Sequence, residues 1–471
     1  MGLNKSIASH AESVEEKYQE MTSAPIGHTL AVLSAPAIVS NLVSTIYNLA
    51  DTYFIGQIST SASGAIGIAY ATMTLIQGIG FFFGQGTGNA LSRELGAKEP
   101  EKASQVATVG VALAFLCGLL VAVFGHVFLR QICLIAGSTD TILPYAMTYI
   151  GIILAGAPWM ATSLVLNCQL RFAGYSFFSM IGLVSGALLN FVLAPLLIFV
   201  CGLGIAGAGL ATITCEAVSF TILLVMIHKT GILKLSRANF KPTAKMLRVI
   251  ANGGFPSLCR QVVFGFATVT LNSAARPYGD AAIAAIAIVQ RIMSLGNCVQ
   301  IGIGQGFQPL CGYNYGAHNF ARVKRAFRDS VLIAIAIIAT FCAVVYFAAV
   351  PIVTLMRDDP KVIYIAVRTL RYQCFSLPLT GLAMLTNFLL QTTGKMWRAT
   401  FLGVARLGII LAPVVLVLSH LFGLAGVECA QAVSDTITML ISLPMAYSIL
   451  HELTLRQEAI DAQRKAGQAQ G

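Results

Sequence analysis

The chain has 471 residues, of which 56% are hydrophobic and 10% are charged, and its mean hydropathy is +0.78. This composition excludes a soluble protein of ordinary make-up and indicates an integral membrane protein. The formal net charge of +11 would suit nucleic-acid binding, but the basic residues follow a membrane topology, so we expect no nucleic-acid partner.

Long apolar runs predict an all-α polytopic membrane protein with twelve transmembrane helices. No Asp, Glu, Lys or Arg occurs from Thr52 to Ser92 or from Phe172 to Cys215. Because one span needs about 20 residues, each run holds most of two helices. In chain order the expected spans are 27–54, 63–90, 104–128, 142–168, 177–200, 205–228, 248–274, 282–310, 328–354, 362–390, 399–420 and 425–450.

Three polar segments lie outside these spans. They are an N-terminal segment over 1–26, a linker over 229–247 and a tail over 451–471, which leave an N-lobe over 27–228 and a C-lobe over 248–450. The first segment lacks the apolar core of a secretory signal, so we expect it to stay uncleaved in the cytoplasm. The tail is typical of a short amphipathic or frayed end.

The two predicted lobes repeat each other at a spacing of 220 residues. Six helices return the chain to its starting side, so the repeats are expected to run parallel, related by an axis along the membrane normal. Two homologous halves in a membrane are typical of a transporter. The repeated positions are Pro36 and Pro256, Gly84-Gln85-Gly86 and Gly304-Gln305-Gly306, Gly96-Ala97 and Gly316-Ala317, Pro158 and Pro378, Asn167 and Asn387, and Gly174 and Gly394.

The basic residues predict the orientation. Six of them lie in and beside the central linker, and the loops on the opposite side hold only Arg130, Arg276, Arg357 and Lys361. Basic residues gather in cytoplasmic loops, so both termini and the linker are expected on the cytoplasmic side. The linker residues are Lys229, Lys234, Arg237, Lys241, Lys245 and Arg248.

Asp51 is the intramembrane charge that most clearly points to function, because such a charge costs roughly 2.5–3.5 kcal/mol on insertion scales. It lies near the outer end of the first span, about four turns after Pro36, and its repeat position is Leu271. A structural role common to both halves is therefore excluded. A functional carboxylate and a residue that caps the helix at the interface are the two interpretations.

Polar residues on neighbouring spans can surround this carboxylate. Asn190, Asn167 and Thr212 either contribute to such a site or form hydrogen bonds between helices, worth about 0.6 kcal/mol each. Glu216 lies one turn after Thr212 on the same helix face. Near the end of each half the repeat spacing falls from 220 to 219 residues, and at this spacing the counterpart of Glu216 is Asp435. An acid at the same position in both halves favours a structural role that both halves share.

The intramembrane polar residues of the second half are mostly basic. An arginine inside a bundle must find acids or carbonyl oxygens, unless it extends from a helix end to the interface. Lining a cavity is the alternative interpretation. The residues are Arg260, Arg291, Arg368, Arg371 and Arg406.

Motifs of soluble enzymes and of metal sites are missing. The glycines at 302, 304 and 306 resemble a nucleotide-binding loop, but they lie within a span. No GxxxxGK[ST], HExxH or GxSxG motif occurs, so neither an ATP-driven pump nor an enzyme is expected. The eleven cysteines form no Cys-x-x-Cys pair or Cys/His cluster, so we expect no metal site or cofactor.

Across essentially its whole length the chain resembles the multidrug and toxic compound extrusion (MATE) transporters, in their bacterial branch related to the DNA-damage-inducible transporters. The resemblance rests on Pro36, on the stretch from Tyr47 to Gly56 that contains Asp51, on the two Gly-Gln-Gly motifs, on Leu189-Asn190 with the following Pro195-Leu-Leu-Ile, and on the stretch Gly304 to Ala317.

The resemblance implies a secondary active efflux pump with two six-helix lobes around a V-shaped central cavity. Influx of H⁺ or Na⁺ would drive export of amphipathic, often cationic, organic compounds. The coupling-ion site would fall on Asp51, Asn190 and Thr212 with Asn167 nearby, and Pro36 would be the hinge of the first helix. Tyr47, Glu216, Arg260 and Arg291 are further candidates at the cavity.

Apart from the coupling ion no cofactor is implied. The expected surroundings are the lipids of the bacterial inner membrane, and the expected state is a monomer.

One departure from the family pattern bears on the coupling ion. Many relatives carry a second acid four residues after the asparagine of the fifth helix, where this chain has Ala194. Na⁺ prefers several oxygen ligands, whereas a single buried carboxyl group can still bind a proton, because burial disfavours its charged form. We therefore favour H⁺ as the coupling ion, with Na⁺ at Asp51, Asn190 and Thr212 as the alternative.

Three rival classes share part of this pattern. A lipid-linked oligosaccharide flippase of a related superfamily would suit the arginines of the second half, but such flippases often have fourteen spans. Major-facilitator uniporters normally carry a GxxxDrxGRR-like loop, which the loop from Ser92 to Lys102 does not match. A membrane enzyme would need a paired-acid or metal-ligand set, which the sequence does not show.

Overall fold

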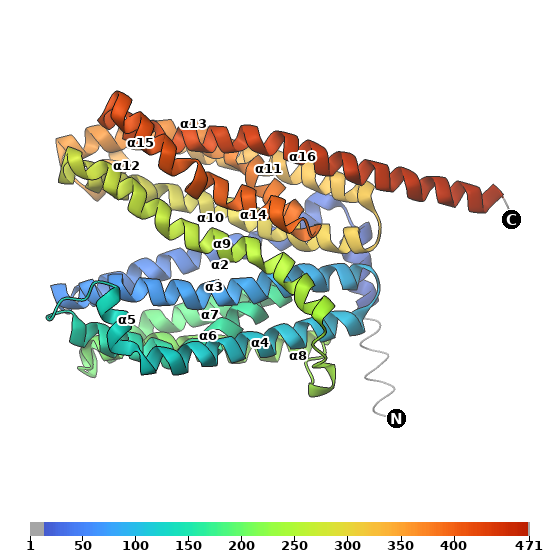
Figure 1. The fold of residues 1–471 in the computed structure, drawn as a ribbon, viewed down its shortest axis with the longest axis horizontal. Helices are drawn as coiled ribbons and strands as arrows, with labels where there is room; N and C mark the ends of the chain where they lie inside the picture. The colour runs from blue at the N-terminus through green and yellow to red at the C-terminus, as the bar shows by residue number, and fades with distance from the viewer. Residues whose placement is uncertain (1–13, 470–471) are drawn as a thin grey trace. The chain divides into compact units, whose positions relative to one another are not determined.

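A computed structural model describes residues 14–469, except for the side chains of 268, 269, 464 and 467–469. The predicted N-terminal segment and tail lie partly outside the described residues. Within them every regular element is a helix (Figure 1). After a helix over 14–23 the elements are α2 (Ile26–Gly56), α3 (Thr60–Gly96), α4 (Pro100–Val127), α5 (Leu129–Ile135), α6 (Leu143–Phe172), α7 (Ser176–Pro195), η1 (Leu196–Val200), α8 (Gly204–Thr230), η2 (Arg237–Asn239), α9 (Ala244–Ala275), η3 (Arg276–Tyr278), α10 (Asp280–Gly316), α11 (Phe320–Phe347), α12 (Ala349–Met356), α13 (Pro360–Thr392), α14 (Met396–Val404), η4 (Ala405–Ile409), α15 (Leu411–Phe422) and α16 (Leu424–Ala469).

The predicted all-α membrane fold is confirmed. Among the described residues, 11 helices are long and apolar enough to cross a membrane. The remaining predicted span, 248–274, falls on α9, which is 32 residues long but is not one of those 11. Each predicted span thus has its helix.

The internal repeat is visible in local backbone geometry as well as in sequence. The short helices α5 and α12 begin 220 residues apart and follow α4 and α11 directly. The turns after α3 and α10 each place a residue other than glycine in the left-handed region, Lys98 at φ 59° and His318 at φ 58°. The same turn has therefore been kept in both halves.

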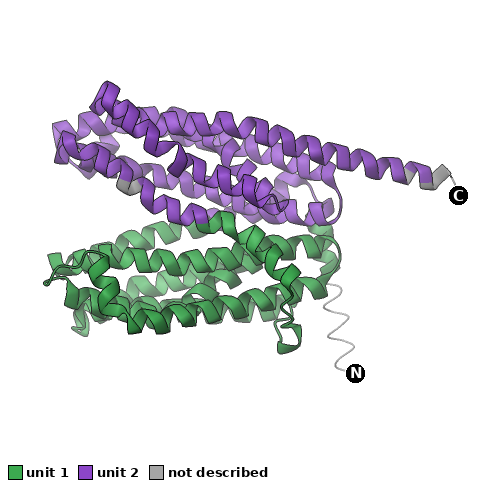
Figure 2. Cartoon of the chain, viewed as in Figure 1, with its two compact units in different colours: residues 1–21, 39–258 green, residues 22–38, 259–471 purple. Residues whose placement is uncertain are grey.

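The described chain forms two compact units, coloured separately in Figure 2. Unit 1 comprises residues 1–21 and 39–258, and unit 2 comprises residues 22–38 and 259–471. The division falls two residues after Pro36 in α2 and two residues after Pro256 in α9. Each of these helices thus changes unit close to its repeated proline, so the units do not coincide with the predicted 27–228 and 248–450 lobes.

The repeated Gly-Gln-Gly motifs allow helices to approach closely within each unit. In unit 1 a methyl group on Gly86 of α3 would overlap the carbonyl oxygen of Ile250 in α9. In unit 2 a methyl group on Gly306 of α10 would overlap Ser34 of α2. The motif therefore holds α9 in unit 1 and α2 in unit 2, in each case on the N-terminal side of the helix's proline.

The structure adds two details to the predicted helices. The tail, expected to be amphipathic or frayed, is helical as far as the structure describes it, because α16 continues without a break to Ala469 (Figure 1). Two π-helical segments interrupt the spans, η1 after Pro195 and η4 between α14 and α15. A π-helical turn shifts the register of the side chains that follow it, and such turns frequently occur at functional sites.

Candidate functional site

Asp51 is buried in unit 1, five residues before α2 ends at Gly56. It is 9% exposed, and its Oδ1 has no hydrogen-bond partner among the described residues. A buried carboxylate oxygen without a partner is costly. The position therefore favours a group that binds a proton or a cation over one that only caps a helix.

Hydroxyl and thiol groups from three helices surround this carboxylate. Tyr47, one turn earlier in α2, Tyr149 in α6 and Cys215 in α8 all lie within electrostatic range of Asp51. The hydroxyl of Thr212 lies close to those of both tyrosines, and it donates a hydrogen bond to the carbonyl of Ala208 at 3.1 Å. The predicted pair of Asp51 and Thr212 is thus brought into one cluster.

Asn190 reaches the same cluster from α7. Its side chain lies beside Cys215, is 2% exposed, and has an Nδ2 without a hydrogen-bond partner among the described residues. The close approach of α7 to α8 depends on Gly186, where a methyl group would lie 3.1 Å from the carbonyl oxygen of Cys215. A second contact positions α8 on α6, where Trp159 Nε1 donates to the carbonyl of Ile213 at 3.1 Å.

Asn167 does not belong to this cluster, contrary to the expectation from the sequence. It lies 18 residues after Tyr149 on the same helix, about 27 Å along the axis at 1.5 Å per residue. Its Nδ2 donates instead to the carbonyl of Ser179 at 2.9 Å. Asn387 makes the corresponding bond to Ala399 in unit 2. The repeated asparagine therefore links two successive helices in each half.

Ala194 and Glu216 lie on either side of the cluster along the helices. Ala194 is fully buried in an apolar core with Ile205, Ala208 and Ala211, so its side chain brings neither a charge nor an oxygen ligand to the cluster. Glu216 is half-buried, one turn from Thr212 toward the C-terminal end of α8, and its carboxylate lies close to Ser163 of α6.

In unit 2 the buried acids have arginine partners. Arg406 of η4 contacts Asp435 of α16 with Nε to Oδ1 at 2.7 Å, and Arg368 of α13 contacts Glu428 of α16 at 3.3 Å. Asp435 is 2% and Glu428 1% exposed. At the 219-residue spacing the position equivalent to Arg406 is Ala187, so unit 1 has no arginine there to pair with Glu216. The predicted structural role common to Glu216 and Asp435 is therefore not supported.

The other two basic candidates of unit 2 have different surroundings. The Arg260 guanidinium lies over the ring of Phe388 at 5.4 Å from its centre, and the residue is half-buried. Arg291 is exposed on α10. Neither lies in unit 1 with Asp51.

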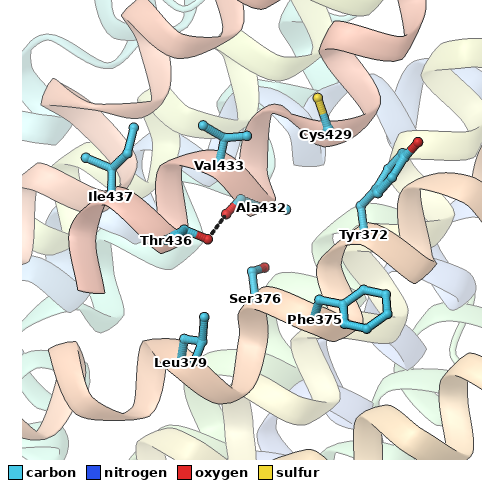
Figure 3. Close-up of a pocket in the computed structure, with 9 residues that line it drawn as sticks. All are labelled: Tyr372, Phe375, Ser376, Leu379, Cys429, Ala432, Val433, Thr436 and Ile437. Atoms are coloured by element: carbon cyan, nitrogen blue, oxygen red, sulfur yellow. Dashed lines mark hydrogen bonds between the residues drawn. The ribbon is translucent and has the colours of Figure 1, made fainter. Parts of the chain in front are cut away.

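Unit 2 contains a pocket of about 390 Å³ between α13 and α16 (Figure 3). Its wall is mostly apolar, and Ser376, at its edge, donates to Asp435 Oδ2 at 3.4 Å. This volume suits a small apolar group. The lining residues are Tyr372, Phe375, Ser376, Leu379, Cys429, Ala432, Val433, Thr436 and Ile437.

Sequence reasoning missed the contribution of Tyr149, Cys215 and Ser163, because uncharged residues within apolar runs give no signal of their own. It also named Asp435 and the arginines of unit 2 without pairing them. The distance of Asn167 from the outer end of its helix could have shown that this residue lies outside the Asp51 cluster.

A family model described as MatE matches residues 36–196 and 256–417 of the chain. The chain belongs to the MATE family. The two matched stretches begin at Pro36 and Pro256, so the family pattern occurs once in each half. The chain is therefore a membrane transporter, and a flippase is not favoured.

Curated relatives support the same assignment. The chain is similar to the multidrug export protein MepA of Staphylococcus haemolyticus (strain JCSC1435), with 30% identity over 430 residues, which cover 91% of this chain and 94% of that protein. MepA of Staphylococcus aureus (strain MRSA252) is 28% identical over 444 residues, covering 94% of this chain and 98% of that protein.

Solved structures show the same fold. A MOP-superfamily transporter from Pyrococcus furiosus Vc1 (DSM3638) matches with a TM-score of 0.87 at 23% identity, over 93% of this chain and 98% of that one. A MATE protein in a straight conformation matches with a TM-score of 0.88 at 23% identity, over 93% and 98% of the two chains. A MATE protein in a bent conformation matches with a TM-score of 0.87 at 23% identity, over 95% of this chain and 99% of that one.

Proposed function

We propose that this MATE transporter is a secondary active antiporter that exports amphipathic, cationic organic compounds in exchange for an ion bound at Asp51. The observation that carries the proposal is the state of this carboxylate, which is buried with an unpartnered oxygen. The described acids of unit 2 at similar depth of burial have arginine partners. The charge of Asp51 must therefore be balanced by an ion from outside the chain.

The surroundings of Asp51 favour a proton as that ion. Na⁺ needs several oxygen ligands, and the position of the family's second acid is an apolar alanine in a closed core. The groups close to Asp51 are hydroxyls, a thiol and an amide, and the further acid Glu216 approaches the cluster only at Tyr47 and Cys215. A proton needs only the one carboxylate.

Transport then follows from the different affinities of two conformations for the ion and the substrate. A proton from outside neutralises Asp51, the α2 helix bends at Pro36, and the protonated form holds a cationic substrate less well because its negative charge is gone. Substrate is released outside and the proton inside. Pro36 suits this role because an internal proline removes one backbone hydrogen bond of the helix.

The class of substrate is inferred from the relatives and from unit 2. Two similar proteins are named multidrug export proteins, and the pocket between α13 and α16 offers an apolar wall for the hydrophobic part of such compounds (Figure 3). The transporter is proposed to act as a monomer among the lipids of the bacterial inner membrane, with both termini in the cytoplasm.

The test is efflux of cationic dyes from proteoliposomes that contain wild-type protein or Asp51→Asn. The variant keeps the size of the side chain but cannot bind a proton, so gradient-driven efflux should fall to the level of empty liposomes while the protein still folds. Asp140→Asn, in an exposed loop of unit 1, is the matched control and should transport normally. Efflux at the wild-type rate by well-folded Asp51→Asn would refute the proposal.

A further inference from the structure

Glu216 is a second intramembrane carboxylate of unit 1, and the proposed cycle leaves it unused. It lies on α8 between two contacts that fix this helix to α6: Trp159 with Ile213, and Ser163 with Ser219, whose Oγ atoms are 3.5 Å apart. Ser163 also lies close to the Glu216 carboxylate. The stretch of α8 that carries Glu216 is therefore fixed against α6.

No basic residue on the elements packed against α8 is placed to neutralise Glu216. The stretch 176–200, which forms α7 and η1, contains no charged residue. On α6 the one basic residue is Arg171, eight residues or about 12 Å along the helix from Ser163. The titratable groups close to Glu216 are Tyr47 and Cys215.

Tyr47 connects the two carboxylates of unit 1. It lies one turn before Asp51 on the same face of α2, and it interacts electrostatically with both Asp51 and Glu216. A change of charge on either carboxylate is therefore felt at the same phenol group. Tyr149, on α6, is a further titratable group in this set, beside Asp51.

The ion pair of the equivalent acid in unit 2 is not repeated at Glu216. At the equivalent position Asp435 binds Arg406, Gln431 and Ser376 at 2.7, 3.1 and 3.4 Å. Unit 1 has Ala187 in place of that arginine, and Glu216 keeps its acid side chain without the ion pair. A carboxylate within a membrane-spanning bundle is costly unless it is paired or neutralised.

We infer that Glu216 is a second coupling carboxylate, linked to Asp51 through Tyr47, so that each transport cycle carries two protons inward. The inference rests on the proposed function. One proton binds each carboxylate from outside, both leave to the inside, and one substrate molecule moves outward. Glu216 is then the second acid of unit 1, on α8, whereas α7 carries no acid.

The stoichiometry can be measured from the limiting gradient that the transporter builds. In proteoliposomes whose membrane potential is held at zero with potassium and valinomycin, a monovalent cationic dye accumulates until its gradient balances that of the protons. Each pH unit is worth a factor of about 10 per proton. Two protons therefore give about a 100-fold dye gradient per pH unit and one proton about 10-fold.

The wild type and two variants decide between the outcomes. We expect a limit of about 100-fold for the wild type, about 10-fold for Glu216→Gln, and recovery toward 100-fold for Glu216→Asp, which retains a carboxylate. A wild-type limit of about 10-fold, or an unchanged limit in Glu216→Gln, would overturn the inference. If Glu216→Gln does not fold, the wild-type limit still decides.

Asp51→Asn in the same assay separates this inference from the function on which it rests. Loss of accumulation in Asp51→Asn together with a 10-fold limit in the wild type would leave the antiporter proposal standing and remove only the role of Glu216. Accumulation by Asp51→Asn would contradict the proposed function itself.

Discussion

Charge compensation separates the acids of the two units at the level of single residues. Asp435 and Glu428 in unit 2 are buried against arginines, whereas Asp51 in unit 1 has an oxygen without a hydrogen-bond partner among the described residues. A paired acid keeps its charge throughout a cycle, but an unpaired buried acid is stable only when it binds an ion. The ion chemistry is therefore expected in unit 1.

Tyr47 should modulate this chemistry without being essential to it. Tyr47→Phe removes the hydroxyl that lies close to Thr212 and Asp51, and one hydrogen bond is worth about 0.5–1.5 kcal/mol. We expect the rate of proton-driven dye efflux to fall about 2- to 10-fold. Tyr53→Phe, which alters an exposed tyrosine on the same helix, is the control; equal rates for the two variants would argue against the role of Tyr47.

The Arg406–Asp435 pair should contribute stability to unit 2. Arg406→Gln leaves Asp435 buried without its counter-charge, which costs about 3–5 kcal/mol for pairs of this kind. We expect a clear fall of the unfolding temperature in detergent, and partial recovery when Asp435→Asn is added. Arg398→Gln, at an exposed site of the preceding helix, should change the unfolding temperature little. An unchanged unfolding temperature in Arg406→Gln would show that the pair is not stabilising.

At the scale of the helices, the repeated glycines determine where α2 and α9 can lie. Both helices change unit close to a proline, and both are held before that proline by a Gly-Gln-Gly motif. A bend at the proline can then occur while the N-terminal part of the helix stays attached. This arrangement gives the repeated glycines a role in packing.

Gly86→Ala tests this packing against a control on the same helix. The added methyl group would overlap the Ile250 carbonyl, so α3 and α9 must separate, and overpacking of this kind typically costs about 1–3 kcal/mol. Gly67→Ala has no neighbouring atom within 4 Å of the added group. Thermal unfolding should therefore occur at lower temperature in Gly86→Ala than in Gly67→Ala. Equal unfolding temperatures would rule out a close contact between Gly86 and Ile250.

The helices could be predicted from sequence to within a few residues, because apolar runs and charged turns mark their ends. The prediction placed the first span at 27–54, and α2 runs from Ile26 to Gly56. The π-helical segments could not be predicted, since they depend on which backbone hydrogen bonds form within an apolar run. The sequence left open whether the tail is helical, because a polar helix end gives the same composition as a frayed one.

For the whole molecule, the internal repeat was predicted correctly, and the positions at which its two halves differ point to the functional site. Asp51 stood out because a charge within a span is rare, and the structure brings Thr212 and Asn190 toward the same cluster. Asn167 was misassigned because the sequence motif gives no depth along the helix. The tyrosines around Asp51 required the fold, since they come from helices far apart in the chain.

The most direct test of the central claim is dye transport by the wild-type protein under separately imposed ion gradients. With a pH gradient and no sodium, a cationic dye should move against its own concentration gradient, and a pH dye inside the vesicles should report proton movement in the opposite direction. A Na⁺ gradient with equal pH on both sides should move no dye. Dye transport driven by Na⁺ alone, or a pH gradient that drives none, would contradict proton coupling at Asp51.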